Sequence, residues 1–248
     1  MSTQLKKELP AHLRVPWRAW DAIVVYILPW IVLPIIVILV AAALAPYSHI
    51  IKVFVDGIQS NDIRANFALV LIDGVGELGV VYLYLKRYHV GWKDVGWRKF
   101  SPLAALALLG LMFIVFSIGV YALTTLVIFL LPAFNANQAQ TNGFTTQTIV
   151  HPSLTLLALV IIPPIIEETV FRGFIFPALS KRYGLIFGAV MTSLLFGLAH
   201  LQANVSVYTF VLSLALCFMY VRLRSIVPGI GLHMLNNYLA YYALSHHL

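Results

Sequence analysis

Charged side chains are scarce in this chain. They make up 10% of its 248 residues, whereas hydrophobic residues make up 61%. A soluble globular domain carries about 25% charged residues. The polar stretches between the apolar runs are also short, which excludes a long soluble domain. The composition therefore predicts a protein that crosses a membrane several times.

Cysteine and acidic residues are also few. The single cysteine, Cys217, lies within an apolar segment, so it excludes an internal disulfide and is interpreted as a small packing residue. The 9 acidic residues and 16 Lys and Arg leave a net charge of +7. Nearly all Lys and Arg flank apolar segments, and no basic cluster accompanies an aromatic reading surface. The positive charge therefore indicates membrane topology, and no nucleic-acid partner is expected.

The apolar runs predict an all-α fold, a polytopic transmembrane helix bundle. Because about 20 residues cross a bilayer, we expect about seven spans, within a range of about six to eight. We place them at 20–45, 67–87, 103–131, 154–179, 185–202, 205–222 and 226–244.

The distribution of basic residues predicts the orientation. Most Lys and Arg fall on one side of the alternating spans, which places the N-terminus in the cytoplasm. We interpret residues 1–248 as a single membrane domain, with a basic cytoplasmic tail at 1–19, an amphipathic interfacial segment at 89–102 and a catalytic core at 154–244. The short loops are typical of an integral protein of a prokaryotic cell membrane.

Two adjacent glutamates lie inside the fourth run. One charge at the centre of a membrane helix costs at least about 2.5–3.5 kcal/mol, so Glu167 and Glu168 indicate a functional site. Glu168 and Arg172 are four residues apart, which favours a structural ion pair on one helix face. Pro163 and Pro164 predict a kink, and freed backbone at membrane depth requires a wet cavity inside the bundle. We expect Glu167 to face this cavity and to carry the chemistry.

Polar residues on two other spans are the candidate partners of Glu167. His200 lies at the end of the fifth run, and His233 and Asn237 share one face of the seventh. A carboxylate with histidines can activate water, either as a general base or around a metal. A histidine or an asparagine amide can donate to a developing oxyanion. Alternatively, His200 is an interfacial residue and the other two form a bond between helices. The constellation favours amide hydrolysis.

These residues carry a resemblance to a known family. The order E-E-x-x-x-R, F-x-x-x-H, H-x-x-x-N, with one motif per helix, resembles the CPBP family of intramembrane proteases (CAAX proteases and bacteriocin-processing, Abi-like enzymes), which includes the Ras-converting CAAX endopeptidases. The resemblance covers residues 160–240. It implies that Glu167 activates water with His200, that His233 and Asn237 stabilise the oxyanion, and that Glu168 and Arg172 support them.

The resemblance leaves the cofactor and the substrate open. Family members have been described both as metalloproteases and as metal-free glutamate enzymes. If a divalent metal such as zinc takes part, Glu167, His200 and His233 would be its ligands, since a catalytic zinc site uses three protein ligands. The implied partner is a peptide or protein substrate, which is prenylated for the CAAX-cleaving members, together with membrane lipid.

Two other functions remain as alternatives. Asp73 and Glu77 lie four residues apart in the second run, among glycines, and with Glu167 they fit a proton- or ion-coupled membrane transporter. A membrane immunity or binding protein with a protease-like scaffold and no catalysis is the third hypothesis.

Overall fold

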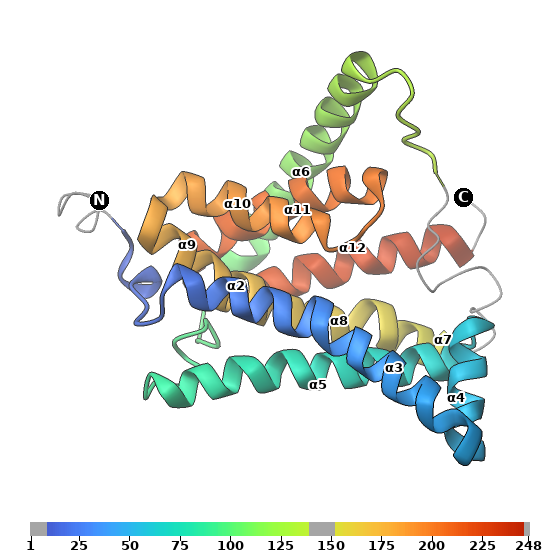
Figure 1. The fold of residues 1–248 in the computed structure, drawn as a ribbon. Coiled ribbons are helices and arrows are strands. Elements are labelled where there is room, and N and C mark those ends of the chain that lie inside the picture. The colour runs from blue at the N-terminus through green and yellow to red at the C-terminus, as the bar shows by residue number, and fades with distance from the viewer. Residues whose placement is uncertain (1–8, 139–151, 246–248) are drawn as a thin grey trace.

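The computed structural model is a bundle of helices (Figure 1) and describes residues 9–138 and 152–245. No strand occurs in that part of the chain. The predicted all-α fold is therefore confirmed. The first eight residues of the predicted tail, including Lys6 and Lys7, lie outside the described residues.

The helices follow one another with few long connections. In chain order they are η1 (Ala11–Leu13), α2 (Ala19–Ile27), η2 (Leu28–Val32), α3 (Leu33–Leu44), η3 (Ala45–Tyr47), α4 (His49–Gln59), α5 (Ile63–Arg87), α6 (Pro102–Leu130), α7 (Pro152–Thr155), η5 (Leu156–Ile161), α8 (Ile162–Glu167), η6 (Glu168–Ile175), α9 (Phe176–Tyr183), α10 (Leu185–Leu198), α11 (Ala203–Leu223) and α12 (Val227–Ser245).

Several of these pieces join into longer rods. Five helical stretches in the described residues are long and apolar enough to cross a membrane: Ala19–Tyr47, Ile63–Arg87, Pro102–Leu130, Pro152–Tyr183 and Ala203–Leu223. They coincide with five of the predicted spans. The other two predicted spans coincide with α10 and α12, and α10 has only 14 residues.

Prolines shape the first and fourth rods. The residue directly before Pro34, Pro163 and Pro177 donates its backbone N–H to the carbonyl five residues earlier, which gives the π-helical turns η2, η5 and η6. A proline ring clashes with the carbonyl four residues before it, and it has no N–H to bond that carbonyl. The helix accommodates the proline by forming a wider, π-helical turn before it. The kink predicted at Pro163 and Pro164 thus takes the form of a π-helical turn in a continuous rod.

The helix α10 is shorter than the hydrocarbon core of a membrane is thick. Gly184, with φ of 94°, lets the chain reverse between α9 and α10. Fourteen residues rise about 21 Å, less than the ~30 Å hydrocarbon core. The predicted fifth span was longer, because it included Ala199–Gln202, where the chain instead turns.

The chain before α2 packs on the end of the fourth rod. The Trp17 indole stacks on Phe174 with ring centroids 4.6 Å apart, and its Nε1–H donates to the Phe174 carbonyl at 2.9 Å. Burial, with Arg98 and Arg224 nearby, lowers the pKa of His12 to about 4. This part of the N-terminal region therefore belongs to the packed core.

In the predicted interfacial segment 89–102, residues 89–101 form turns and irregular chain, and α6 begins at Pro102. Val95 is fully buried, and the Trp97 Nε1–H donates to the Thr169 hydroxyl at 3.2 Å. The Gly96 carbonyl accepts from the Ile226 N–H at 3.0 Å, just before α12. Trp92 remains exposed, so an anchoring role stays a prediction for that side chain. The segment ties η6 to the start of α12.

Candidate active site

One imidazole connects the two glutamates. His233, in α12, places Nδ1 at 3.1 Å from Glu168 Oε1 and Nε2 at 3.6 Å from Glu167 Oε2. The first distance is a hydrogen bond, and the second is too long for one. Because a carboxylate oxygen can only accept, Nδ1 carries a hydrogen when Glu168 is ionised. The bond therefore turns Nε2 towards Glu167.

The predicted Glu168–Arg172 pair forms at the start of η6. Arg172 Nη1 donates to Glu168 Oε1 at 2.8 Å, and both side chains have 0% exposure. The guanidinium also lies over the Phe196 ring, 4.5 Å from its centroid. A buried charge is tolerated when it is paired and hydrogen-bonded. The same carboxylate oxygen serves Arg172 and His233, so the pair also holds the imidazole.

Glu167 is the more accessible of the two glutamates. Its side chain is 14% exposed, against 0% for Glu168. The two residues are adjacent, so the helix points their side chains in different directions. The division between a structural and a chemical glutamate stays a prediction.

His200 lies at the turn that follows α10. Its Nδ1 is 2.9 Å from the Phe196 carbonyl, which can only accept, so this ring nitrogen carries the hydrogen. In the neutral ring Nε2 is then an acceptor. The rings of His200 and His233 both make edge contacts with Phe196, with centroids 5.1 and 5.7 Å apart. The structure thus gathers both histidines around one phenylalanine.

Asn237 donates to a backbone carbonyl that has no helical donor because of a proline. Its Nδ2 donates to the Leu159 carbonyl at 2.9 Å. Leu159 lies four residues before Pro163, the position at which proline removes the helical donor. Asn236 Nδ2 donates to Asn237 Oδ1 at 3.2 Å, and the Tyr208 hydroxyl donates to Asn236 Oδ1. Asn237 therefore makes the interhelical bond that was its structural alternative, and its second amide hydrogen is left for another acceptor.

Two further acids lie near this group. Glu77, in α5, is 7% exposed and interacts electrostatically with Glu167 and Asp73. Gly74 brings α5 close to α8, since a Cβ on it would lie 2.2 Å from Ile166 Cδ1. The three acids of the transporter hypothesis are thus neighbours.

The conditional metal ligands do not assemble into a metal site. Within the described ranges, no group of three His, Cys, Asp or Glu side chains is placed to hold an ion. Glu167 Oε2 and His233 Nε2 lie 3.6 Å apart, but His200 does not join them in such a group. The residues in this arrangement do not fit a metal, and the mechanism below uses none.

Comparison with known proteins supports the resemblance. Residues 149–239 match the model of a family described as Type II CAAX prenyl endopeptidase Rce1-like. We call residues 149–239 the Rce1-like region. All six predicted site residues fall inside this Rce1-like region: Glu167, Glu168, Arg172, His200, His233 and Asn237.

Two curated proteins are similar to parts of the chain. A protein of Escherichia coli described as "Uncharacterized 24.3 kDa protein" is 33% identical over 129 residues, which are 50% of this chain and 58% of that protein. The protein of Bacillus subtilis (strain 168) named "Putative membrane peptidase YdiL" is 29% identical over 84 residues, 34% of each chain. The chain therefore spans 58% of the length of the Escherichia coli protein and 34% of the length of the Bacillus subtilis protein. No solved structure matches.

Sequence reasoning assigned no role to several residues of the Rce1-like region. Phe196 contacts Arg172 and both histidines, and the F-x-x-x-H spacing was the signal for it. Asn236 and Tyr208 support Asn237. The Tyr208–Asn236 contact joins α11 to α12, and no spacing within one segment could show it.

Proposed function

We propose that this chain is an intramembrane endopeptidase that hydrolyses a peptide bond with water activated by Glu167. The observation that carries the proposal is the His233 bridge, with Nδ1 bonded to buried Glu168 and Nε2 3.6 Å from the more exposed Glu167. A base, a donor aimed beside it and a residue that orients the donor are the parts that acyl transfer needs. The Rce1-like match supports the same reaction class.

The first step is attack by water. Glu167 accepts a proton from the water, and His200 Nε2, as an acceptor, holds the other hydrogen. The oxygen forms a bond to the peptide carbonyl carbon, and the carbonyl π electrons move to its oxygen. Glu167 is then protonated and beside the tetrahedral intermediate.

The second step is collapse of that intermediate. In this step His233 is an imidazolium, with Nδ1–H bonded to Glu168 and a second hydrogen on Nε2, and it donates to the oxyanion together with the second amide hydrogen of Asn237. The carbonyl re-forms, the C–N bond breaks, and Glu167 returns its proton to the leaving amine. Removal of one such donor typically lowers the rate about 10²–10³-fold.

The substrate class follows from the membrane setting. We propose a peptide or protein substrate that reaches the site from the bilayer, lipidated as in the CAAX-cleaving members. We place the enzyme in a prokaryotic cell membrane with its N-terminus in the cytoplasm, where the basic segments lie.

The test replaces one glutamate at a time. Cells with wild-type, Glu167→Gln or Glu77→Gln protein are compared by proteomics for uncleaved substrates, and peptides found this way are assayed with purified protein. We expect Glu167→Gln to lower cleavage by at least about 10³-fold, and Glu77→Gln to cleave within about 10-fold of wild type. Unchanged cleavage by Glu167→Gln would contradict the proposal. Full biological activity of that variant would favour a non-catalytic immunity or binding protein.

The acidic cluster favours a second candidate, a proton-coupled transporter. Glu77 is buried next to Glu167 and Asp73, which fits a proton relay inside a bundle. Liposomes with the purified protein and a pH-sensitive dye separate the two functions. Proton flux that disappears in both Glu77→Gln and Glu167→Gln would favour transport, whereas a protease gives no flux.

A further inference from the structure

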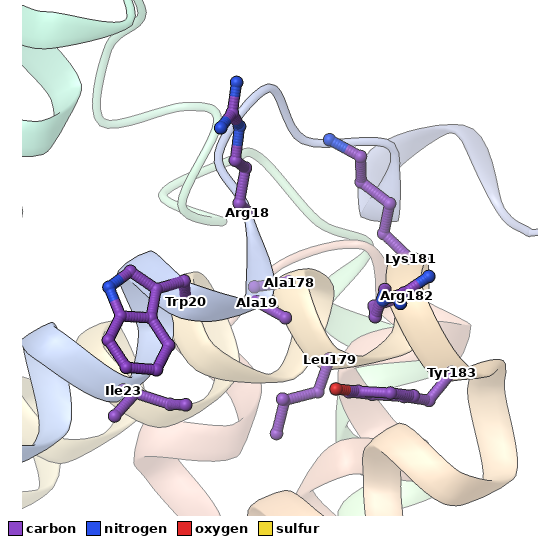
Figure 2. A pocket seen from close by; sticks show the side chains of 9 residues that line it. All are labelled: Arg18, Ala19, Trp20, Ile23, Ala178, Leu179, Lys181, Arg182 and Tyr183. Atoms are coloured by element: carbon purple, nitrogen blue, oxygen red, sulfur yellow. The ribbon is translucent and has the colours of Figure 1, made fainter.

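A pocket lies between the start of α2 and the end of α9, away from the glutamates. Its volume is about 540 Å³, within the range of small-molecule sites. Figure 2 shows Trp20 and Ile23 on one side, Arg182 and Tyr183 on the other, and Ala178 and Leu179 between them. We call it the α2–α9 pocket. Two rods, Ala19–Tyr47 and Pro152–Tyr183, end here, so the pocket lies at one membrane face.

Positive charge dominates the α2–α9 pocket. Arg18, Lys181 and Arg182 line it, and no Asp or Glu does. Arg18 and Arg182 are exposed, and neither forms an ion pair with the described residues. The nearby carboxylate of Asp21 accepts the Arg18 backbone N–H at 2.7 Å and the Tyr88 hydroxyl at 2.6 Å. Two guanidinium groups are therefore available to an anion.

Lys181 fixes one wall of the pocket. Its ammonium donates to the carbonyls of Val15, Pro16 and Trp17 at 2.7, 3.2 and 3.2 Å. These bonds hold the chain before α2 against α9. The pocket is therefore formed before any ligand binds, which reduces the entropic cost of binding.

The apolar part of the pocket continues along a helix face. Trp20 and Tyr183 are 68% and 52% exposed, and amphipathic aromatic rings of this kind collect at membrane interfaces. Ile23 and Ile27, four residues apart, are also exposed on α2. An apolar strip thus leads from the cationic pocket towards the middle of the membrane.

We propose that the α2–α9 pocket binds one anionic phospholipid. Its phosphate lies between the Arg18 and Arg182 guanidinium groups, which bind phosphate with paired N–H donors. Its acyl chains follow Trp20, Ile23 and Ile27. Basic pockets between membrane helices on the cytoplasmic side recognise anionic headgroups in this way.

The bound lipid joins the first rod to the rod that carries the glutamates. The Trp17 indole already bonds the Phe174 carbonyl in η6, the segment that begins at Glu168. A lipid that contacts both α2 and α9 reinforces this contact and stabilises the fold. The proposal does not depend on protease activity.

The test measures thermal unfolding of the full chain in neutral detergent. Phosphatidylglycerol or phosphatidylcholine is added to the micelles, and inorganic phosphate is the third arm. We expect saturating phosphatidylglycerol to raise the midpoint by about 5 °C, and the other two additions to change it by less than about 1 °C. The Arg18→Gln/Arg182→Gln variant should lose at least about half of the lipid shift, because both side chains are exposed and their loss leaves the fold intact.

The matched control removes two charges at the end of α5. Lys86→Gln/Arg87→Gln has the same net charge as the pocket variant, and both residues are exposed outside the pocket. It should keep the full lipid shift. Trp20→Ala should weaken the response to lipid. An equal loss in both double variants would overturn the proposal in favour of diffuse attraction, and a full shift with inorganic phosphate would reduce it to a simple anion site.

Discussion

The His233 imidazole is held by residues of the fourth rod and of α10. Glu168 fixes its Nδ1, Arg172 shares the same carboxylate oxygen, and Phe196 contacts the ring edge. A histidine with one nitrogen bonded to a buried carboxylate keeps its other nitrogen directed at a reacting group. The Glu168–Arg172 pair is thus both an electrostatic tether and the support of a proposed oxyanion donor.

These two roles predict different results for a single substitution at Glu168 and for a double substitution at Glu168 and Arg172. Glu168→Gln leaves Arg172 buried and unpaired, so we expect a loss of about 3–5 kcal/mol in unfolding free energy and at least about 10-fold in cleavage. Glu168→Gln/Arg172→Met removes both charges, and its stability should largely return. Its cleavage should stay low because His233 remains unsupported. Thermal unfolding and cleavage rates are the measurements. Recovery of both stability and cleavage in the double variant would show that the pair acts only as an electrostatic tether.

Glycine decides how closely η6 approaches the segment 89–102. A Cβ on Gly173 would lie 2.4 Å from the Val95 carbonyl oxygen and 3.0 Å from the Val95 Cβ. The first distance is shorter than any van der Waals contact, and the neighbour is backbone that cannot turn away. The same segment bonds Ile226 ahead of α12, so η6, the segment and α12 are fixed together.

Gly173→Ala should therefore destabilise the protein. Alanine favours a helix over glycine by about 1 kcal/mol, but overpacking costs about 1–3 kcal/mol. We expect a lower unfolding midpoint and reduced cleavage, since η6 carries Glu168. Gly110→Ala is the control, because nothing lies within 4 Å of its added Cβ. Gly110→Ala should be neutral or slightly stabilising. Equal unfolding midpoints for the two variants would show that the close approach of Gly173 to Val95 does not limit stability.

The whole molecule has a consistent charge asymmetry. The ends of α5 and α9 and the start of α2 lie at the same end of the bundle in Figure 1, and each carries exposed basic residues. α5 is 25 residues long, about 37 Å, so its two ends lie at opposite faces of a bilayer. Once the cytoplasmic face is known for one end of α5, the orientation of the whole bundle is known.

The positive-inside rule predicts that orientation. In a Cys217→Ser background, Arg87→Cys should react with a membrane-impermeant maleimide only after cells are opened. Lys52→Cys, in α4 before the other end of α5, should react in intact cells. The reverse pattern of labelling would place the N-terminus outside.

The sequence by itself determined the helical membrane fold, the position of the spans and the Glu168–Arg172 pair. Each of these depends on neighbours within one helix, where the spacing of residues fixes which side chains share a face. The tertiary structure decided that His233 bridges both glutamates, that Asn237 binds the Leu159 carbonyl, and that α2 and α9 enclose a cationic pocket. Those contacts join helices far apart in the chain, so they depend on how the rods pack, on widened turns before prolines and on the short α10, none of which the spacing within one segment specifies.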